Sequence, residues 1–371
     1  MRFVITGGGT GGHIYPALAI ARGLQQKYPG GKILYVGTDR GLEAEIVPKA
    51  GLAFRTIRVA GLKRSLSPAN LAVLWQTAAG LAGAARILRS FRPAAVVGTG
   101  GYVCGPVVLA AAGLRIPTLI HEQNALPGIT NRILARIAGR VAVTFDESAR
   151  YFGRRARVLV TGLPVRPEVI AAGREEARAG LDVKDGRMLV LSFGGSQGAR
   201  TINQAMIEVL KQLGGKPDLQ FLHVAGPKQY EGFMDDLKKS GMTAEKYGNI
   251  TIEPYLHRMP EALAAADLLI CRAGAATIAE LTVRGLPAIL IPYPHAAANH
   301  QEHNARVLAE RGAALMVLDR DLRGEMLAGL LSGLLENRPR LKAMSEKSLQ
   351  LGRPGALDDI LDSLAGLISR P

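Results

Sequence analysis

Short apolar runs alternate with longer segments of helical spacing along almost the whole chain. Each run holds three to six mostly aliphatic or β-branched residues, which is long enough only for a buried strand. This alternation predicts an α/β protein whose parallel sheets are covered by helices on both faces. The expected strands lie at residues 3–6, 32–36, 54–57, 94–97, 118–120, 141–143 and 158–160, and then at 188–192, 219–224, 250–252, 268–271 and 288–291.

A break in this pattern divides the strands into two series. Residues 161–167 read TGLPVRP, and two prolines beside a glycine are typical of a linker between domains. In each series a glycine-rich turn follows the first strand, so we expect two Rossmann-like, doubly wound domains that face each other across a cleft. The predicted units are an N-terminal domain over 1–163, a C-terminal domain over 164–350 and a final segment over 351–371, whose helix packs across the domain junction.

The first glycine turn has the chemistry of a phosphate-binding loop. Residues 7–12 read GGGTGG and lie between the first strand and a helix that begins at His13. A turn in this place aims backbone N–H groups and the positive end of the helix dipole at an anion, and glycine lets the backbone approach that anion closely. Because Gly7-x-Gly9-x-x-Gly12 and a following Asp39 also match the dinucleotide fingerprint, this stretch alone leaves an NAD enzyme open.

Composition narrows the class of protein. The chain has 371 residues, 48% of them hydrophobic and 21% charged, as in ordinary globular proteins of two domains. The N-terminal apolar run is too short for a signal peptide, and the two cysteines, Cys104 and Cys271, are too few for a disulfide framework or a cysteine metal site. We therefore expect a cytoplasmic protein with two buried, reduced cysteines.

The net charge of +15 comes entirely from the first half of the chain. Residues 1–165 hold 21 basic and 6 acidic side chains, whereas residues 166–371 hold 25 of each. Such one-sided charge favours an anionic partner, which is a phosphorylated substrate, an anionic membrane or a nucleic acid. Aromatic residues make up only 5% of the chain and do not interleave with the basic ones, so binding to nucleic acid is not expected.

One apolar stretch, residues 69–88, has the length of a membrane span, although polar residues interrupt it. The simpler interpretation is a surface helix with its apolar face in the core. The alternative is an interfacial patch in which Leu71, Leu74 and Trp75 enter lipid while nearby arginines meet anionic headgroups. A spanning helix is not expected.

Polar side chains follow several of the predicted strands at their carboxyl ends. Residues 121–124 read HEQN, residues 272–280 read RAGAATIAE, and residues 295–304 hold three histidines. Carboxyl ends of parallel strands share one edge of a sheet, so these groups are expected to line a polar cleft. Glu280 is placed to accept two ribose hydroxyls, although it also suits a solvent-facing position on a helix. The histidine spacing is not HExxH, so no metal site is predicted.

Seven motifs, taken together, resemble the MurG family of bacterial glycosyltransferases. They are GGTGGH (8–13), GGYVCGP (100–106), HEQN (121–124), PVR (164–166), GGSQGAR (194–200), RAGAATIAE (272–280) and NHQ (299–301), in the order and spacing of that family over essentially the whole chain. The resemblance implies a GT-B fold and transfer of N-acetylglucosamine from UDP-GlcNAc to lipid I, which gives lipid II for peptidoglycan, with inversion at the anomeric carbon. It also implies no metal or other cofactor, a peripheral place on the cytoplasmic face of the cell membrane, and cell-wall synthesis proteins as further partners.

The resemblance also implies roles for individual residues. The donor would lie mainly against the C-terminal domain, with Glu280 on the ribose and with Arg166 and Ser196 near the diphosphate. The other implied donor contacts are Thr10, Gly11, Gly12, Asn124, Leu256 at the uracil, Gly274, Ala275, Ala276, Thr277, Ile278, Ala279, Asn299, His300 and Gln301. The implied contacts of the acceptor diphosphate are Gly8, Gly9, Gly100, Gly101 and Tyr102. Ala273 and Leu163 depart from the family pattern, which commonly has Ser and Asn, so these two positions lack a polar contact.

The reaction itself requires a base. The C4 hydroxyl of the muramic acid must attack the sugar from the face opposite UDP, and a general base must accept its proton. His13 is the first candidate and Glu122 the second, although His13 also suits a purely positioning role. Backbone N–H groups at a helix start and Arg166 are expected to stabilise the leaving diphosphate.

Three other interpretations compete with this one. A dehydrogenase would use the first turn and Asp39 but leaves the glycine turn of the second series, Glu280 and the NHQ motif unexplained. A UDP-GlcNAc 2-epimerase has the same twin-domain fold and would turn over without an acceptor. A non-enzymatic membrane or nucleic-acid binder would rest on the basic half alone and would consume no UDP-sugar.

Overall fold

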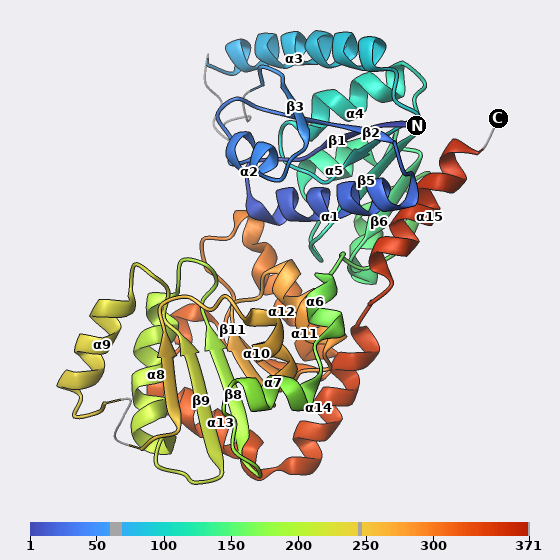
Figure 1. The fold of residues 1–371 in the computed structure, drawn as a ribbon. Coiled ribbons are helices and arrows are strands. Elements are labelled where there is room, and N and C mark those ends of the chain that lie inside the picture. The colour runs from blue at the N-terminus through green and yellow to red at the C-terminus, as the bar shows by residue number, and fades with distance from the viewer. Residues whose placement is uncertain (60–68, 244–246, 370–371) are drawn as a thin grey trace. The chain divides into compact units, whose positions relative to one another are not determined.

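The computed structural model describes residues 1–59, 69–243 and 247–369, and the side chains of residues 69–77 lie outside this description. The chain divides into two compact units, each with a sheet of its own (Figure 1). The first unit comprises Met1–Pro164 and Pro354–Pro371, and the second comprises Val165–Arg353.

A seven-stranded parallel sheet in the order β3-β2-β1-β4-β5-β6-β7 forms the centre of the first unit. Its strands are β1 (Arg2–Thr6), β2 (Lys32–Gly37), β3 (Ala53–Thr56), β4 (Ala95–Gly98), β5 (Thr118–Glu122), β6 (Arg140–Val143) and β7 (Val158–Val160). Its α-helices are α1 (Gly11–Lys27), α2 (Glu43–Lys49), α3 (Ala69–Phe91), α4 (Cys104–Gly113), α5 (Ile129–Leu134) and α15 (Ala356–Ile368). All seven predicted strands are confirmed within two residues. The inner strands are buried runs of apolar side chains, whereas the edge strands β3 and β7 are largely exposed.

Alternate residues of these strands point to opposite faces and build two separate cores. Phe3 and Ile5 of β1 pack with α1 and α15 on one face, whereas Val4 packs with α3 and α4 on the other. In Figure 1, α3 and α4 lie on one side of this sheet and α1 lies on the other. Both cysteines of the chain are buried and reduced, as predicted.

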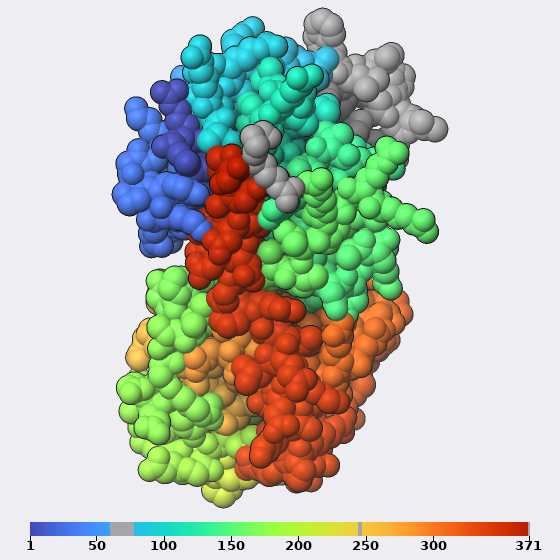
Figure 2. All heavy atoms as spheres, turned by 90° about the vertical axis from the view of Figure 1, so that its right-hand side faces the viewer, coloured from blue at the N-terminus to red at the C-terminus, as the bar shows by residue number. Residues whose placement is uncertain are grey.

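The last helix, α15, completes the first of these cores. Ile360 and Leu361 are buried against α1, and a Cβ on Gly23 of α1 would lie 2.9 Å from Leu361, so glycine there lets the two helices approach closely. Lys27 forms an ion pair with Asp362 at the edge of this contact. Figure 2 shows α15 in red against the blue and green surface of the first unit.

A six-stranded parallel sheet in the order β10-β9-β8-β11-β12-β13 forms the centre of the second unit. Its strands are β8 (Met188–Phe193), β9 (Leu219–Val224), β10 (Ile250–Glu253), β11 (Leu268–Cys271), β12 (Ala288–Leu290) and β13 (Ala314–Met316). Its α-helices are α6 (Pro167–Ala171), α7 (Arg174–Gly180), α8 (Arg200–Leu213), α9 (Tyr230–Lys239), α10 (Met259–Ala265), α11 (Ala275–Val283), α12 (His300–Glu310), α13 (Gly324–Glu336) and α14 (Arg338–Leu351). The edge strand β13 was not predicted, because its three residues, Ala-Leu-Met, carry no β-branched side chain.

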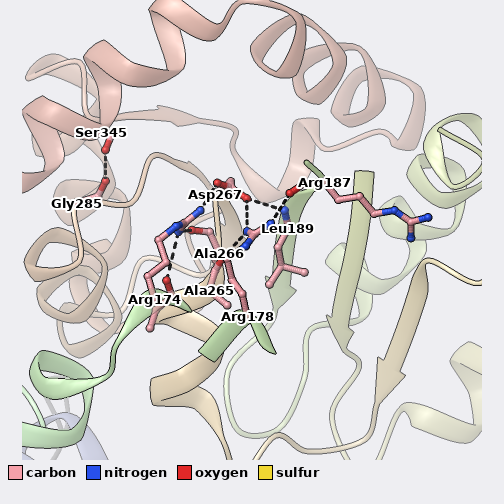
Figure 3. A network of polar contacts seen from close by, with 10 residues as sticks. Arg174, Arg178, Arg187, Leu189, Ala265, Ala266, Asp267, Gly285 and Ser345 are labelled. Carbon is pink, nitrogen blue, oxygen red and sulfur yellow. Dashed lines mark hydrogen bonds and ion pairs between the residues drawn. The ribbon is translucent and has the colours of Figure 1, made fainter. Parts of the chain in front are cut away.

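One carboxylate joins α7 to the start of β11 and to β8 (Figure 3). Asp267 accepts hydrogen bonds from Arg174 Nη2 at 2.5 Å, from Arg178 Nη1 at 3.2 Å and from the Leu189 backbone N–H at 2.7 Å. The two arginines also donate to backbone carbonyls, among them those of Ala266 and Arg187. The side chain of Asp267 is only 20% exposed, so its negative charge compensates Arg174 and Arg178 in a partly buried environment.

We expect Asp267→Asn to lower the free energy of unfolding by about 2–4 kcal/mol, because it leaves two neighbouring guanidinium groups without their carboxylate. Urea unfolding measures this change. The matched control is Asp182→Asn, which removes the exposed ion pair to Lys184 and should cost less than about 1 kcal/mol. Equal effects of the two substitutions would contradict this account of the network.

A buried histidine makes the second unit sensitive to acid. His223 of β9 is fully buried, its Nδ1 lies 2.8 Å from Ser192 Oγ, and its ring packs on Phe233. Burial lowers the pKa of His223 to about 3, so the folded protein keeps this imidazole neutral while the unfolded chain binds a proton below about pH 6.5. Stability is therefore lost as the pH falls from about 6.5 toward 3.

Between pH 7 and pH 5 this single group should lower the free energy of unfolding by about 2 kcal/mol. We expect the variant His223→Gln to lose correspondingly less stability than the wild type over the same interval, since all other titrating groups are shared. Urea unfolding at the two pH values measures the difference. An identical pH dependence in the two proteins would rule the assignment out.

The stretch with the length of a membrane span forms α3. In its described part Ala84 and Leu88 are buried in the core, while Arg86 and Arg89 are exposed, which agrees with a surface helix. Among the residues that the structure describes, no helix combines the length and the apolarity needed to cross a membrane. The side chains of Leu71, Leu74 and Trp75 lie outside the described residues.

Candidate functional site

Each sheet has one topological switch point, where the connections leave two neighbouring strands in opposite directions. It lies between β1 and β4 in the first sheet and between β8 and β11 in the second. Ligands of doubly wound sheets bind beside such points, at the carboxyl ends of the strands. Glycine-rich turns at 7–10, 99–103 and 194–199 follow β1, β4 and β8, and the motif at 272–280 follows β11. The first turn, predicted over 7–12, is shorter because α1 already begins at Gly11.

Hydrogen bonds interlock the two glycine turns of the first unit. The Gly8 N–H donates to the Gly100 carbonyl at 3.3 Å, and the Thr99 N–H donates to the Thr6 carbonyl at 2.9 Å. The Tyr35 hydroxyl, which is buried under the first turn, donates to the Gly7 carbonyl at 2.7 Å. The two turns therefore act as one rigid unit.

Protein groups fill most of the space that glycine leaves in these turns. A Cβ on Gly7 would lie 2.0 Å from Thr99 Oγ1, and a Cβ on Gly8 would lie 2.6 Å from the carboxyl carbon of Glu43. A Cβ on Gly12, in contrast, would meet nothing closer than 3.7 Å. The expectation that glycine opens the backbone to a phosphate therefore fits the start of α1 better than it fits Gly7 and Gly8.

His13 stands between the two turns. It is half-buried in the first turn of α1, its Nδ1 lies 3.1 Å from Thr10 Oγ1, and its backbone carbonyl accepts a hydrogen bond from Thr99 Oγ1 at 2.8 Å. The ring lies so close to Gly100 that a Cβ there would be 2.9 Å from Nε2. If Nδ1 carries the proton and donates to Thr10, Nε2 holds the lone pair that a general base needs.

The remaining acceptor-side residues are part of the same arrangement. Gly9 and Thr10 are exposed, while Gly100 is buried and Gly101 is half-buried. The Tyr102 hydroxyl lies 3.3 Å from Thr38 Oγ1. The Gly9 N–H donates to Glu43 Oε2 at 3.0 Å, so this group is already engaged within the protein.

Glu122, the second candidate base, is buried at the end of β5. Its carboxylate accepts hydrogen bonds from the N–H groups of Asn124 and Gly128 at 3.0 and 3.1 Å, and from the side-chain amide of Asn131 at 2.9 Å. Burial raises the pKa of Glu122 above its usual range, and these hydrogen bonds offset only part of that rise. Since both oxygens hold the turn that leads to α5, the geometry suits an anchoring role better than proton transfer to a substrate.

Its neighbours in the HEQN motif are held equally firmly. Burial lowers the pKa of His121 to about 4, and its Nε2 lies 2.9 Å from the Gly162 carbonyl. Gln123 donates from Nε2 to the Thr99 carbonyl at 2.8 Å, which ties β5 to the second glycine turn. Asn124 is half-buried and donates to Glu122. The HEQN motif thus supports the glycine turn after β4 through the hydrogen bond from Gln123 to Thr99.

In the second unit the structure brings two predicted donor-site residues together. Arg166, at the start of α6, donates from Nε to Glu280 Oε1 at 2.6 Å and from Nη2 to Oε2 at 3.0 Å. The Glu280 side chain is 15% exposed, whereas that of Arg166 is 49% exposed. The hydrogen bond to Glu280 raises the pKa of Arg166, so the pair is a charge-assisted fork on the first turns of α11.

The other predicted donor residues of the second unit lie in the turn after β8, after β10 and at the start of α11. Gly274 caps this helix in an extended conformation, so the first N–H groups of α11 have no partner within the helix. Ser196 is exposed in the turn after β8, and Leu256 is half-buried between β10 and α10. Residues with partly or fully exposed positions at the helix start are Gly274, Ala275, Ala276, Thr277 and Glu280, whereas Ile278 and Ala279 are buried.

Gln301 links the carboxyl ends of two strands. Its Oε1 accepts from the Ala273 N–H at 3.2 Å and from the Tyr293 N–H at 2.9 Å, just beyond β11 and β12. Asn299, which precedes α12, has the left-handed conformation with φ 55°, and Ala298 before it has φ 52°. Two consecutive non-glycine residues in that region store strain, which is typical of a functional turn. His300 follows, with its Nδ1 2.8 Å from the Ala297 carbonyl.

Sequence reasoning missed a buried arginine behind this site. Arg272 forms an ion pair with Asp319, donates to Thr201 Oγ1 at 3.0 Å and lies under the ring of Tyr293, 5.6 Å from its centroid. It thereby joins the turn after β11 to the start of α8 and to the end of β12. Arg272 is the first residue of the RAGAATIAE motif, but no local sequence pattern indicates that its ion-pair partner is Asp319, 47 positions along the chain.

The described part of the chain supports neither a metal site nor the acid of a dinucleotide-binding fold. Within 1–59, 69–243 and 247–369, no three His, Cys, Asp or Glu side chains are grouped to hold a metal ion. Asp39, the acid that a dinucleotide fingerprint requires, is exposed, and the carboxylate that reaches the first glycine turn is instead that of Glu43.

Comparison with known families accounts for most of the chain. The model of the "Glycosyltransferase family 28 N-terminal domain" matches residues 3–143, and the model of the "Glycosyltransferase family 28 C-terminal domain" matches residues 189–360. These two matches contain the switch points of both sheets.

Curated relatives and solved structures agree with these models. A protein of Desulforamulus reducens named "UDP-N-acetylglucosamine--N-acetylmuramyl-(pentapeptide) pyrophosphoryl-undecaprenol N-acetylglucosamine transferase" is 57% identical over 370 residues, which cover 100% of each chain. A protein of Desulforudis audaxviator with the same name is 55% identical over 100% of this chain and 99% of its own. The crystal structure of MurG from Acinetobacter baumannii matches with a TM-score of 0.81 and 32% identity, over 98% of this chain and 99% of that one.

Proposed function

The chain belongs to glycosyltransferase family 28, and within it to the MurG transferases, and from that membership we propose its reaction. It transfers N-acetylglucosamine from UDP-GlcNAc to lipid I, which gives lipid II and UDP in peptidoglycan synthesis. The observation that carries this proposal is the full-length identity of 57% to a relative whose name states that transfer.

The geometry of the second unit supports a role in holding the donor. The carboxylate of Glu280 can accept the ribose hydroxyls with the lone pairs that Arg166 leaves, and the N–H groups at the start of α11 suit the phosphates. The exposed part of the Arg166 guanidinium neutralises charge that develops on the leaving diphosphate. Gln301 and Asn299 hold the sugar from the ends of β11 and β12.

In the first unit we move the acceptor diphosphate from Gly8 and Gly9, whose N–H groups are already bonded within the protein, to the start of α1, which the resemblance had given to the donor. His13 takes the proton of the attacking hydroxyl. The C4 hydroxyl forms a bond to C1 of the sugar as the bond to UDP breaks, so the configuration inverts. His13 is the proposed base in preference to Glu122 because it is half-buried at the start of α1, whereas Glu122 is buried and its oxygens hold the turn that leads to α5. No metal takes part in this scheme.

The experiment that tests the function is UDP release from UDP-GlcNAc, with and without a lipid I analogue, in the presence of EDTA. Release that needs the acceptor, survives chelation and yields a β-linked disaccharide is the expected result. Turnover without acceptor would indicate an epimerase instead. That rival stands on fold alone, since a UDP-GlcNAc 2-epimerase from Neisseria meningitidis matches with a TM-score of 0.66 at 14% identity.

The proposal places the protein at the cytoplasmic face of the cell membrane as a peripheral protein. Besides the predicted contact at Leu71, Leu74 and Trp75, the described surface offers isoleucines one helical turn apart. Ile129 is 68% exposed and Ile133 is 55% exposed, and the exposed Arg132 and Arg136 flank them. Apolar side chains beside arginines suit an interface with anionic lipid.

We expect Ile133→Glu to weaken binding to anionic vesicles by roughly tenfold or more, since it removes an exposed aliphatic group that would enter the lipid and adds a charge that anionic headgroups repel. Vesicle sedimentation measures the binding. The matched control is Ile170→Glu, which changes an exposed isoleucine of α6 in the second unit. Charged replacements at Leu71, Leu74 and Trp75 should act like Ile133→Glu. If the variants of both regions stay folded and bind as the wild type does, the membrane contact lies elsewhere.

A further inference from the structure

We propose that Glu43 is a positioning residue for the acceptor. Its buried carboxylate accepts the hydrogen bond of the Gly9 N–H, so that this group of the first glycine turn is not available to the substrate. The acceptor's diphosphate therefore binds at the start of α1. This inference rests on the proposed transferase function. It concerns a residue that lies outside the glycine motifs and that would not itself touch the substrate.

Glu43 is fully buried at the beginning of α2. Its Oε2 accepts from the Gly9 N–H at 3.0 Å, and its Oε1 accepts from the Thr38 N–H at 3.2 Å and from the Thr38 hydroxyl at 2.7 Å. These three donors are neutral groups. A charged group without water needs such donors, so the turn and the carboxylate stabilise one another.

Three glycines are shaped around this carboxylate. A Cβ added to Gly8 would lie 2.6 Å from the Glu43 carboxyl carbon, and a Cβ added to Gly41 would lie 2.4 Å from the same atom. A Cβ added to Gly37 would lie 2.7 Å from Glu43 Cγ. Two of the three lie outside the turn, at the end of β2 and before α2. A pocket for this side chain is therefore built into the fold from three separate segments.

The same carboxylate reaches the second glycine turn through Thr38. The Thr38 hydroxyl donates to Glu43, accepts from the Gly41 N–H at 3.2 Å and lies 3.3 Å from the Tyr102 hydroxyl. Tyr102 belongs to the turn after β4. One buried charge is thus connected to both turns that were predicted to hold the acceptor.

The electrostatic consequence is directional. A carboxylate in contact with the Gly9 N–H takes up the anion-binding capacity of that group and repels a second anion from it. The N-terminal dipole of α1, in contrast, attracts negative charge to Gly11 and Gly12. Glu43 therefore sets the place of the diphosphate along the turn, and with it the distance of the acceptor hydroxyl from His13.

The variant Glu43→Gln tests the proposal. Glutamine keeps the size of the side chain but places an NH₂ group against either the Gly9 N–H or the Thr38 donors. We expect KM for a lipid I analogue to rise roughly 10- to 100-fold, because the turn and the diphosphate shift, while KM for UDP-GlcNAc stays within about twofold. The matched control is Glu45→Gln on the same helix, an exposed residue paired with Lys49, which should leave both constants unchanged.

An unchanged or lower KM for the acceptor in folded Glu43→Gln would overturn the proposal, and so would an equal rise in both KM values. If Glu43→Gln does not fold, Thr38→Val decides, since it removes the hydroxyl that joins Glu43 to Tyr102 and should raise the acceptor KM alone. A wild-type protein that releases no UDP would instead refute the proposed function, whatever the variants do.

Discussion

Replacing His13 by alanine is expected to lower kcat roughly 10²- to 10⁴-fold, the usual contribution of a general base. The residue is held between two rigid turns, with Nδ1 3.1 Å from Thr10 Oγ1 and Nε2 beside Gly100. A base so placed should also control the pH dependence. The acidic limb of the kcat/KM profile, where the imidazole of the wild type becomes protonated, should disappear in His13→Ala.

Two comparisons separate a base from a positioning residue. Thr10→Val removes the hydroxyl beside Nδ1 and should lower kcat less than His13→Ala does, while the acidic limb remains. His13→Ala should bind UDP as tightly as the wild type, because the proposed contacts to UDP are dominated by the second unit. An acidic limb that persists unchanged in His13→Ala would show that another group is the base.

The second large effect is expected at Glu280. We expect Glu280→Gln to raise KM for UDP-GlcNAc roughly 10- to 100-fold, because it removes the charge from the hydrogen bonds to the ribose and leaves Arg166 without its carboxylate. Calorimetric titration with UDP should show a loss of similar size. Binding of the acceptor should change little.

Glu168→Gln is the matched control for this experiment. Glu168 lies two residues from Arg166, is exposed and adds only a minor electrostatic contribution to the raised pKa of Arg166. Its loss should alter UDP affinity by less than about twofold, as expected for an exposed charge. Equal effects of Glu168→Gln and Glu280→Gln would mean that net charge near the site, rather than the fork at Glu280, controls donor binding.

Much of the fold follows from local pattern. The central strands of a doubly wound sheet are buried on both faces, so they are nearly continuous apolar runs, and most of the twelve predicted strands have that feature. The edge strands β3 and β7 are largely exposed and were predicted from short runs of strand-forming residues. The edge strand β13 was not predicted, because it is short and its residues, Ala-Leu-Met, favour helices. The contact of α15 with α1 could not be predicted, since amphipathic spacing tells which face of a helix is buried but not what covers it.

The site was predictable in outline but not in its internal contacts. Glycine turns and polar residues at strand ends predict where a ligand binds, because the topology brings strand ends together. The pairing of Arg166 with Glu280 joins residues 114 positions apart, and no local spacing encodes it. Glu43 reads in the sequence as an ordinary acid at a helix start, and only the packing of α2 against the first turn reveals what its carboxylate does.

The packing of α15 in the first unit has a consequence for how the protein folds during its synthesis. The second unit is continuous, so it has all its residues once Arg353 has left the ribosome. The first unit starts before the second in the sequence but needs Ile360 and Leu364 to seal the core beside α1, and these residues are translated only after the whole second unit. A nascent chain therefore carries an unfinished core until the second unit has been synthesised, and a fragment that stops at Pro164 should gain solubility only when residues 354–371 are fused to it.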